Sequence, residues 1–92
     1  MYAVQLRLIP SQRTAATPSP DDLTDISTRA RDAFADLEHI RIRTGAEDIL
    51  LTMFIAADSS TGAAATSLVI ARHIVATETA VRGWRCAADS AA

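Results

Sequence analysis

The most reactive side chains in this chain belong to two histidines and one cysteine, His39, His73 and Cys86. The histidines lie far apart and have no Cys or carboxylate at ligand spacing, so they do not form a metal site. A single cysteine excludes an internal disulfide, and Cys86 has no neighbouring base to activate it. We therefore predict two solvated surface histidines, a buried inert thiol, and no catalytic, metal or cofactor-binding residue.

The segment Asp58-Ser59-Ser60-Thr61-Gly62 is the other candidate for chemistry, because it precedes a predicted helix over residues 63–77. Free backbone amides at a helix start can hold an anion. Helix capping needs the same residue types, however, and the lysine of a phosphate-binding loop is absent. The segment is therefore predicted to cap the helix.

Length and composition indicate a single domain over residues 1–92. An apolar fraction of 49% is enough for a core, although so small a domain gains stability from oligomerising. The net charge of −2 argues against a general polyanion binder but leaves local patches open. All nine basic residues are arginine, a bias that suggests a GC-rich genome. The sequence shows neither a signal peptide nor a membrane span, so we expect a cytoplasmic protein.

Residues 49–57 form the most apolar stretch, and they are apolar at both parities, as expected for the central strand of a sheet. Residues 2–9 alternate cleanly and predict a half-buried strand. Residues 39–43 alternate too, and the Gly-containing turn over residues 44–48 predicts an antiparallel hairpin with the central strand. A short last strand is expected over residues 81–86, with Trp84 favoured as an inward side chain because an unpaired buried arginine is costly.

A first helix is predicted to begin after Ser19, the N-cap, with Pro20 in its first turn and an apolar stripe that continues to Leu37. In the second helix, Val69 and Ile70 are expected to lie outside the apolar stripe, which is formed by Ala64, Leu68, Ala71 and Val75, with Ile74 beside them. Residues 10–19 are expected to form a mobile surface loop, and residues 87–92 a fraying tail.

The resulting order, strand-helix-strand-strand-helix-strand, resembles the α+β ferredoxin-like fold, also called split βαβ. This resemblance implies a four-stranded antiparallel sheet with both helices on one face. Right-handed crossovers would place the first and third strands in the middle and the second and fourth at the edges. The charged second strand suits an edge, since charge there resists pairing with other chains.

One sheet face is left uncovered in such a fold, and we predict that it is an interaction surface. Its residues would be Arg7, Arg41, Arg43, Leu50, Thr52 and Phe54, with Val69 and Ile70 as a second surface. The favoured function is a non-catalytic interaction or dimerisation module, an accessory or regulatory subunit that associates with itself, by stacking of faces or of edges, or with another protein.

Two further functions stay open. Resemblance to the dimeric α+β barrel group would imply a small enzyme or ligand-binding protein with a cavity between sheet and helices. Some sheet faces of this topology bind RNA by stacking bases on exposed aromatic side chains. Here only one aromatic is expected on the face, and the net charge is negative, so nucleic acid is disfavoured as a partner.

Overall fold

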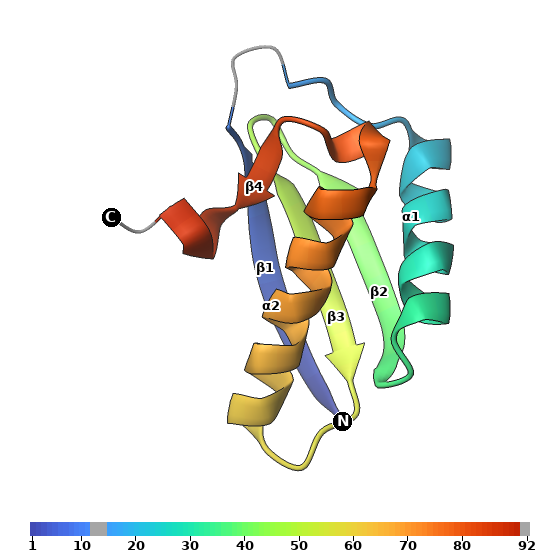
Figure 1. Ribbon diagram of the computed structural model, residues 1–92, viewed down its shortest axis with the longest axis vertical. Helices are drawn as coiled ribbons and strands as arrows, with labels where there is room; N and C mark the ends of the chain where they lie inside the picture. The colour runs from blue at the N-terminus through green and yellow to red at the C-terminus, as the bar shows by residue number, and fades with distance from the viewer. Residues whose placement is uncertain (12–14, 91–92) are drawn as a thin grey trace.

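The computed structural model describes residues 1–11 and 15–90 of the chain. It is an α+β ferredoxin-like domain, as the order of elements predicted. The elements are β1 (Tyr2–Pro10), α1 (Pro20–Ala33), β2 (Leu37–Thr44), β3 (Ile49–Ile55), α2 (Ser60–Thr77), η1 (Thr79–Val81), β4 (Trp84–Cys86) and η2 (Ala87–Ser90), where η denotes a 3-10 helix. The strands form one antiparallel sheet in the order β2-β3-β1-β4, and both helices cover the same face (Figure 1).

Strand β3 lies at the centre of the fold, hydrogen-bonded to β1 on one side and to β2 on the other. Its odd-numbered residues, from Ile49 to Ile55, point toward the helices and are buried, whereas Leu50, Thr52 and Phe54 point the other way and are half-buried. Two paired neighbours explain why β3 is apolar at both parities, since even its uncovered face is partly shielded by adjacent strands. The predicted hairpin between β2 and β3 is confirmed.

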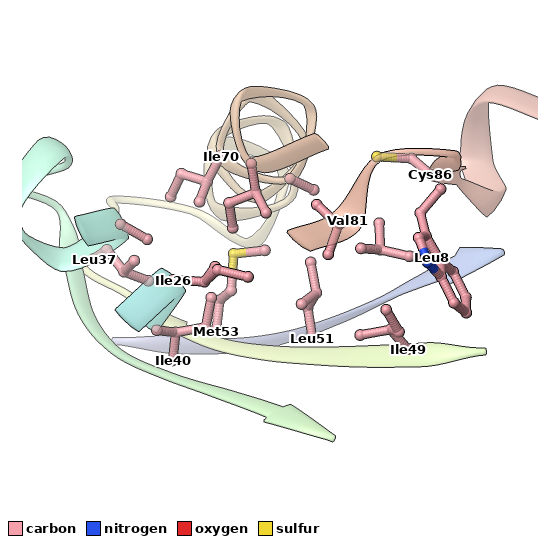
Figure 2. Close-up of a cluster of buried hydrophobic side chains, with 14 of the residues drawn as sticks. Leu8, Ile26, Leu37, Ile40, Ile49, Leu51, Met53, Ile70, Val81 and Cys86 are labelled. Atoms are coloured by element: carbon pink, nitrogen blue, oxygen red, sulfur yellow. The ribbon is translucent and has the colours of Figure 1, made fainter. Parts of the chain in front are cut away.

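The hydrophobic core fills the layer between the sheet and the helices (Figure 2). Met53 and Leu51 of β3 meet Ile26 of α1 and Ile70 of α2 there, and all four are at most 1% exposed. Strand β4 turns Trp84 and Cys86 inward, which confirms the favoured parity of that strand.

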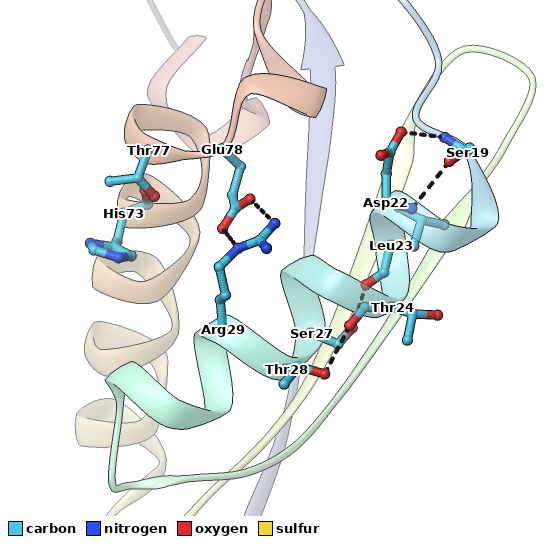
Figure 3. Close-up of polar contacts among 10 residues, drawn as sticks. All are labelled: Ser19, Asp22, Leu23, Thr24, Ser27, Thr28, Arg29, His73, Thr77 and Glu78. Carbon is cyan, nitrogen blue, oxygen red and sulfur yellow. Dashed lines mark hydrogen bonds and ion pairs between the residues drawn. The ribbon is translucent and has the colours of Figure 1, made fainter.

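Helix α1 begins as predicted but ends earlier. The Ser19 hydroxyl accepts a hydrogen bond from the Asp22 N–H at 3.1 Å, and the Asp22 carboxylate accepts one from the Ser19 N–H at 2.9 Å (Figure 3). The apolar stripe had predicted a helix reaching Leu37. Instead Phe34 is extended, and Leu37 opens β2 opposite Ile55. Leu37 is buried in either arrangement, so burial alone did not locate the boundary.

Helix α2 turns a side to the sheet that matches the predicted one only at Ala71 and Ile74. The buried residues are Ala63, Ser67, Ile70, Ala71 and Ile74. The expectation that Ile70 lies on a surface is therefore wrong, because it is fully buried, whereas Val69 is 56% exposed. Small side chains at Ala63 and Ser67 let the helix approach the sheet, and the Ser67 hydroxyl is satisfied by donating to the Ala64 carbonyl at 2.7 Å.

The connections around β4 make defined contacts with the rest of the domain. The Trp84 indole N–H donates to the Ala16 carbonyl at 2.9 Å, and Pro18 is buried, so the described part of the loop after β1 packs against the domain. Gly83, with a φ of 87°, makes the turn into β4, and its carbonyl accepts hydrogen bonds from the N–H and hydroxyl of Ser11. The tail predicted over residues 87–92 includes a 3-10 helix over Ala87–Ser90. Residues 12–14 and 91–92 lie outside the described residues.

Candidate interaction surface

The face of the sheet turned away from the helices, called here the bare face, carries the residues that the strand registers place at alternate positions. They are Ala3, Gln5, Arg7 and Ile9 of β1, His39, Arg41 and Arg43 of β2, Leu50, Thr52 and Phe54 of β3, and Arg85 of β4. All six sheet residues of the predicted interface therefore lie on one face. Val69, predicted for a second surface, lies apart on α2.

A shallow hollow of about 300 Å³ occupies the part of the bare face formed by β1, β3 and β2. It is lined by Gln5, His39, Arg41, Arg43, Leu50, Thr52 and Phe54. The hollow thus brings together five of the six predicted residues. Arg7 does not line it, although its register position is opposite Leu50.

The charge on the bare face is one-sided. Arg7 lies beside Asp48, with its Nε atom 3.8 Å from the carboxylate. The side chains of Arg41 and Arg43 have no ion-pair or hydrogen-bond partner among the described side chains, those of residues 1–11 and 15–88. None of the side chains placed on this face by the strand registers is a carboxylate. Helix α1, on the opposite side of the sheet, carries Asp21, Asp22, Asp25 and Asp32.

The bottom of the hollow combines an apolar surface with hydrogen-bonding groups. The rings of His39 and Phe54 are in contact, with centroids 5.9 Å apart and planes tilted by 45°. The Gln5 amide donates a weak hydrogen bond to the Thr52 hydroxyl at 3.4 Å. Arginine, aromatic and aliphatic side chains in one depression are the composition typical of protein-binding surfaces.

The predicted interface did not include His39, Gln5 or Arg85, which also belong to this surface. Strand parity already placed His39 outward and Gln5 on the bare face, but neither was combined with the arginines. The outward position of Arg85 follows from the inward position of Trp84, because successive side chains of a strand point to opposite faces. The remaining reactive residues lie elsewhere: His73 is exposed on α2, where its ring meets Phe34 edge-on at 5.1 Å, and the Cys86 thiol is buried.

The lining of the hollow offers charge, hydrogen bonds and apolar contact, with one histidine and no carboxylate or thiol beside it. Within the described part of the chain, no three His, Cys, Asp or Glu side chains gather as metal ligands would. None of the described helices combines the length and hydropathy needed to cross a bilayer. The arrangement is suited to holding a partner that supplies negative charge.

Comparison of the chain with protein-family models, with curated proteins and with solved structures finds no match. The fold and the surface therefore define the class: a small ferredoxin-like domain with a cationic, partly apolar sheet face.

Proposed function

We propose that this protein is a non-catalytic interaction module whose bare face binds an acidic segment of another protein, as an accessory or regulatory subunit would. The observation that carries the proposal is the pair of arginines, Arg41 and Arg43, next to Leu50 and Phe54, with no carboxylate among the residues that line the hollow. The cytoplasmic location expected from the sequence belongs to the same proposal.

Charge decides against a second copy stacked symmetrically on this face. A twofold stack of two bare faces would bring two arginine-rich surfaces together, and like charges brought together in an interface oppose binding. Four of the eleven acidic residues of a second copy, Asp21, Asp22, Asp25 and Asp32, lie on α1, outside its own bare face. A different, acidic partner removes this repulsion and supplies the missing counter-charges.

The chemistry of the hollow specifies more than negative charge. Guanidinium groups bind carboxylates through two parallel hydrogen bonds, and such pairs are stronger where neighbouring apolar contact excludes water. Leu50 and Phe54 provide that contact, and both are half-buried before any partner binds. The best ligand is therefore a peptide that alternates Asp or Glu with Leu, Ile or Phe.

Selection from a displayed random peptide library tests this proposal. The wild-type protein should enrich peptides that contain both acidic and apolar residues. The double variant Arg41→Glu/Arg43→Glu should bind those peptides with an affinity at least about ten times lower. Arg31→Glu/Arg82→Glu is the matched control, because it makes the same change of charge at exposed positions outside the bare face and should retain binding.

Three outcomes would contradict the proposal. Failure of the wild type to enrich any acidic peptide removes the binding role, and equal binding by the Arg41→Glu/Arg43→Glu variant removes the bare face as the site. Salt-sensitive binding of a single-stranded RNA oligonucleotide, in the absence of peptide enrichment, would favour the RNA-binding alternative. A thermal shift with small aromatic acids and no peptide binding would favour a ligand-binding or enzymatic role.

A further inference from the structure

The outer edge of β1 lacks a paired strand over six of its nine residues. Strand β4 pairs only with Leu8, Ile9 and Pro10, and η2, which continues directly from β4, also contacts β1. On that side, no strand in the described part of the chain pairs with Tyr2–Arg7, although β3 pairs with all of these residues from the other side. An edge of this kind presents unpaired N–H and C=O groups that can accept another strand.

The open edge is also uncharged from Tyr2 to Leu6. The opposite edge of the sheet, β2, carries Glu38, Arg41 and Arg43. Charged edge strands resist pairing with other chains, whereas a short uncharged edge lacks that protection. The two edges of this sheet therefore differ, and the β1 edge is the one suited to pairing.

Apolar side chains continue from this edge onto α2. Tyr2, Val4 and Leu6 point to the helix side and are only partly buried against the core. On α2, His73 faces α1, because its ring contacts Phe34. Leu68 lies five residues earlier, about 140° around the helix, and so on the flank away from α1. It too is only partly buried.

We propose that two copies of this chain pair antiparallel through the β1 segment Tyr2–Leu6, with Val4 near the twofold axis. Antiparallel pairing of a strand with its own copy is self-complementary, so one patch serves both subunits. Tyr2 then faces the partner's Leu6, and the two four-stranded sheets become one continuous sheet. Both copies of Leu68 come close to the junction and extend the apolar contact between the α2 helices.

This pairing is independent of the acidic partner proposed above. It leaves the two bare faces uncovered on the same side of the joined sheet, and it brings together neither Arg41 nor Arg43. It also provides the self-association that the sequence suggests without the repulsion of a face-to-face stack.

Light scattering after size exclusion tests the proposal with the intact chain. The wild type should be a dimer in the micromolar range. Ala3→Lys/Ala64→Lys places like charges at exposed positions beside the junction and should give a folded monomer. Ala33→Lys/Ala76→Lys, the same change at exposed positions away from the junction, should remain a dimer, and so should Phe54→Glu on the bare face.

A monomeric wild type overturns the proposal, and so does a dimer that Phe54→Glu dissociates while Ala3→Lys/Ala64→Lys does not. Variants that add one cysteine to the native Cys86 then locate the twofold axis. With oxidised glutathione as the oxidant, Val4→Cys should form a disulfide-linked dimer, because directly opposed residues of an antiparallel pair lie close together. Thr44→Cys on the β2 edge should remain unlinked, and linkage there instead would assign the contact to the wrong edge.

Discussion

Arg29 of α1 and Glu78 at the end of α2 form a two-pronged ion pair that joins the two helices (Figure 3). The Arg29 Nη2 atom lies 2.6 Å from Glu78 Oε1, and Nε lies 2.9 Å from Oε2. Hydrogen bonding to Glu78 raises the pKa of Arg29, and desolvation acts in the opposite direction. The pair therefore links the end of α2 directly to α1.

Replacing Glu78 with Gln should lower the thermal unfolding midpoint modestly while leaving the fold intact, because the pair is largely exposed to solvent on the Arg29 side. Because the pair raises the pKa of Arg29 in the folded state, its contribution to stability is fully present at every pH below the ordinary pKa of arginine. The difference between wild type and variant should therefore stay constant from neutral pH to about pH 10. A difference that shrinks over that range would mean that another group controls it.

The capping box at the start of α1 should contribute measurably to stability. Ser19→Ala removes the hydroxyl that accepts from Asp22 and should lower the free energy of unfolding by about 1 kcal/mol in urea titrations. Thr28→Ala is the control, since Thr28 is exposed within the helix and its replacement should change stability by less than about 0.5 kcal/mol. Equal effects of the two changes would argue against the cap.

The two faces of β3 should respond differently to truncation. Met53 is fully buried, so Met53→Ala should cost about 2 to 5 kcal/mol of unfolding free energy. Its neighbour Thr52 lies on the bare face, and Thr52→Ala should cost less than about 1 kcal/mol. Chemical denaturation of both variants checks the parity of the central strand, because a reversed order of the two losses would require the opposite face to be covered.

Trp84 should hold the described part of the β1–α1 connection through its indole N–H. Trp84→Phe keeps an aromatic ring in place but removes the hydrogen bond to the Ala16 carbonyl, with an expected loss of about 1 kcal/mol. Amide hydrogen exchange should become faster at residues 15–17 before it changes in β3. Unchanged exchange in that segment would show that packing of Pro18, rather than the indole, holds the connection.

The topology of the sheet was predictable because each local signal agreed with the same arrangement. Ser19 and Pro20 mark a helix start, the alternation in residues 2–9 marks a strand, and the apolar run of residues 49–57 marks the centre of the sheet. The bare face followed from strand parity alone. The interface residues could be named before their geometry was known because the two-residue period of a strand fixes which face each side chain takes.

The errors arose where burial has two structural explanations. Leu37 continues the apolar spacing of α1 but is buried as the first residue of β2. On α2, the spacing of Leu68 and Val75 suggested the buried side. In the structure the small residues Ala63 and Ser67 face the sheet instead, and Ile70 lies in the core with them. The gathering of Arg7, Arg41, Arg43 and Arg85 on one face of the sheet depends on how the strands pair. For that reason, net charge alone pointed away from an anionic partner.

Cys86 provides this protein with a native chemical probe of one edge of its sheet. It is the only thiol in the chain, it is 1% exposed, and it lies in the three-residue strand β4. A thiol reagent can reach it only when β4 separates from β1 or when the whole domain unfolds. Because strand opening and global unfolding respond differently to denaturant, labelling rates measured across a urea series would separate the two events without an introduced label.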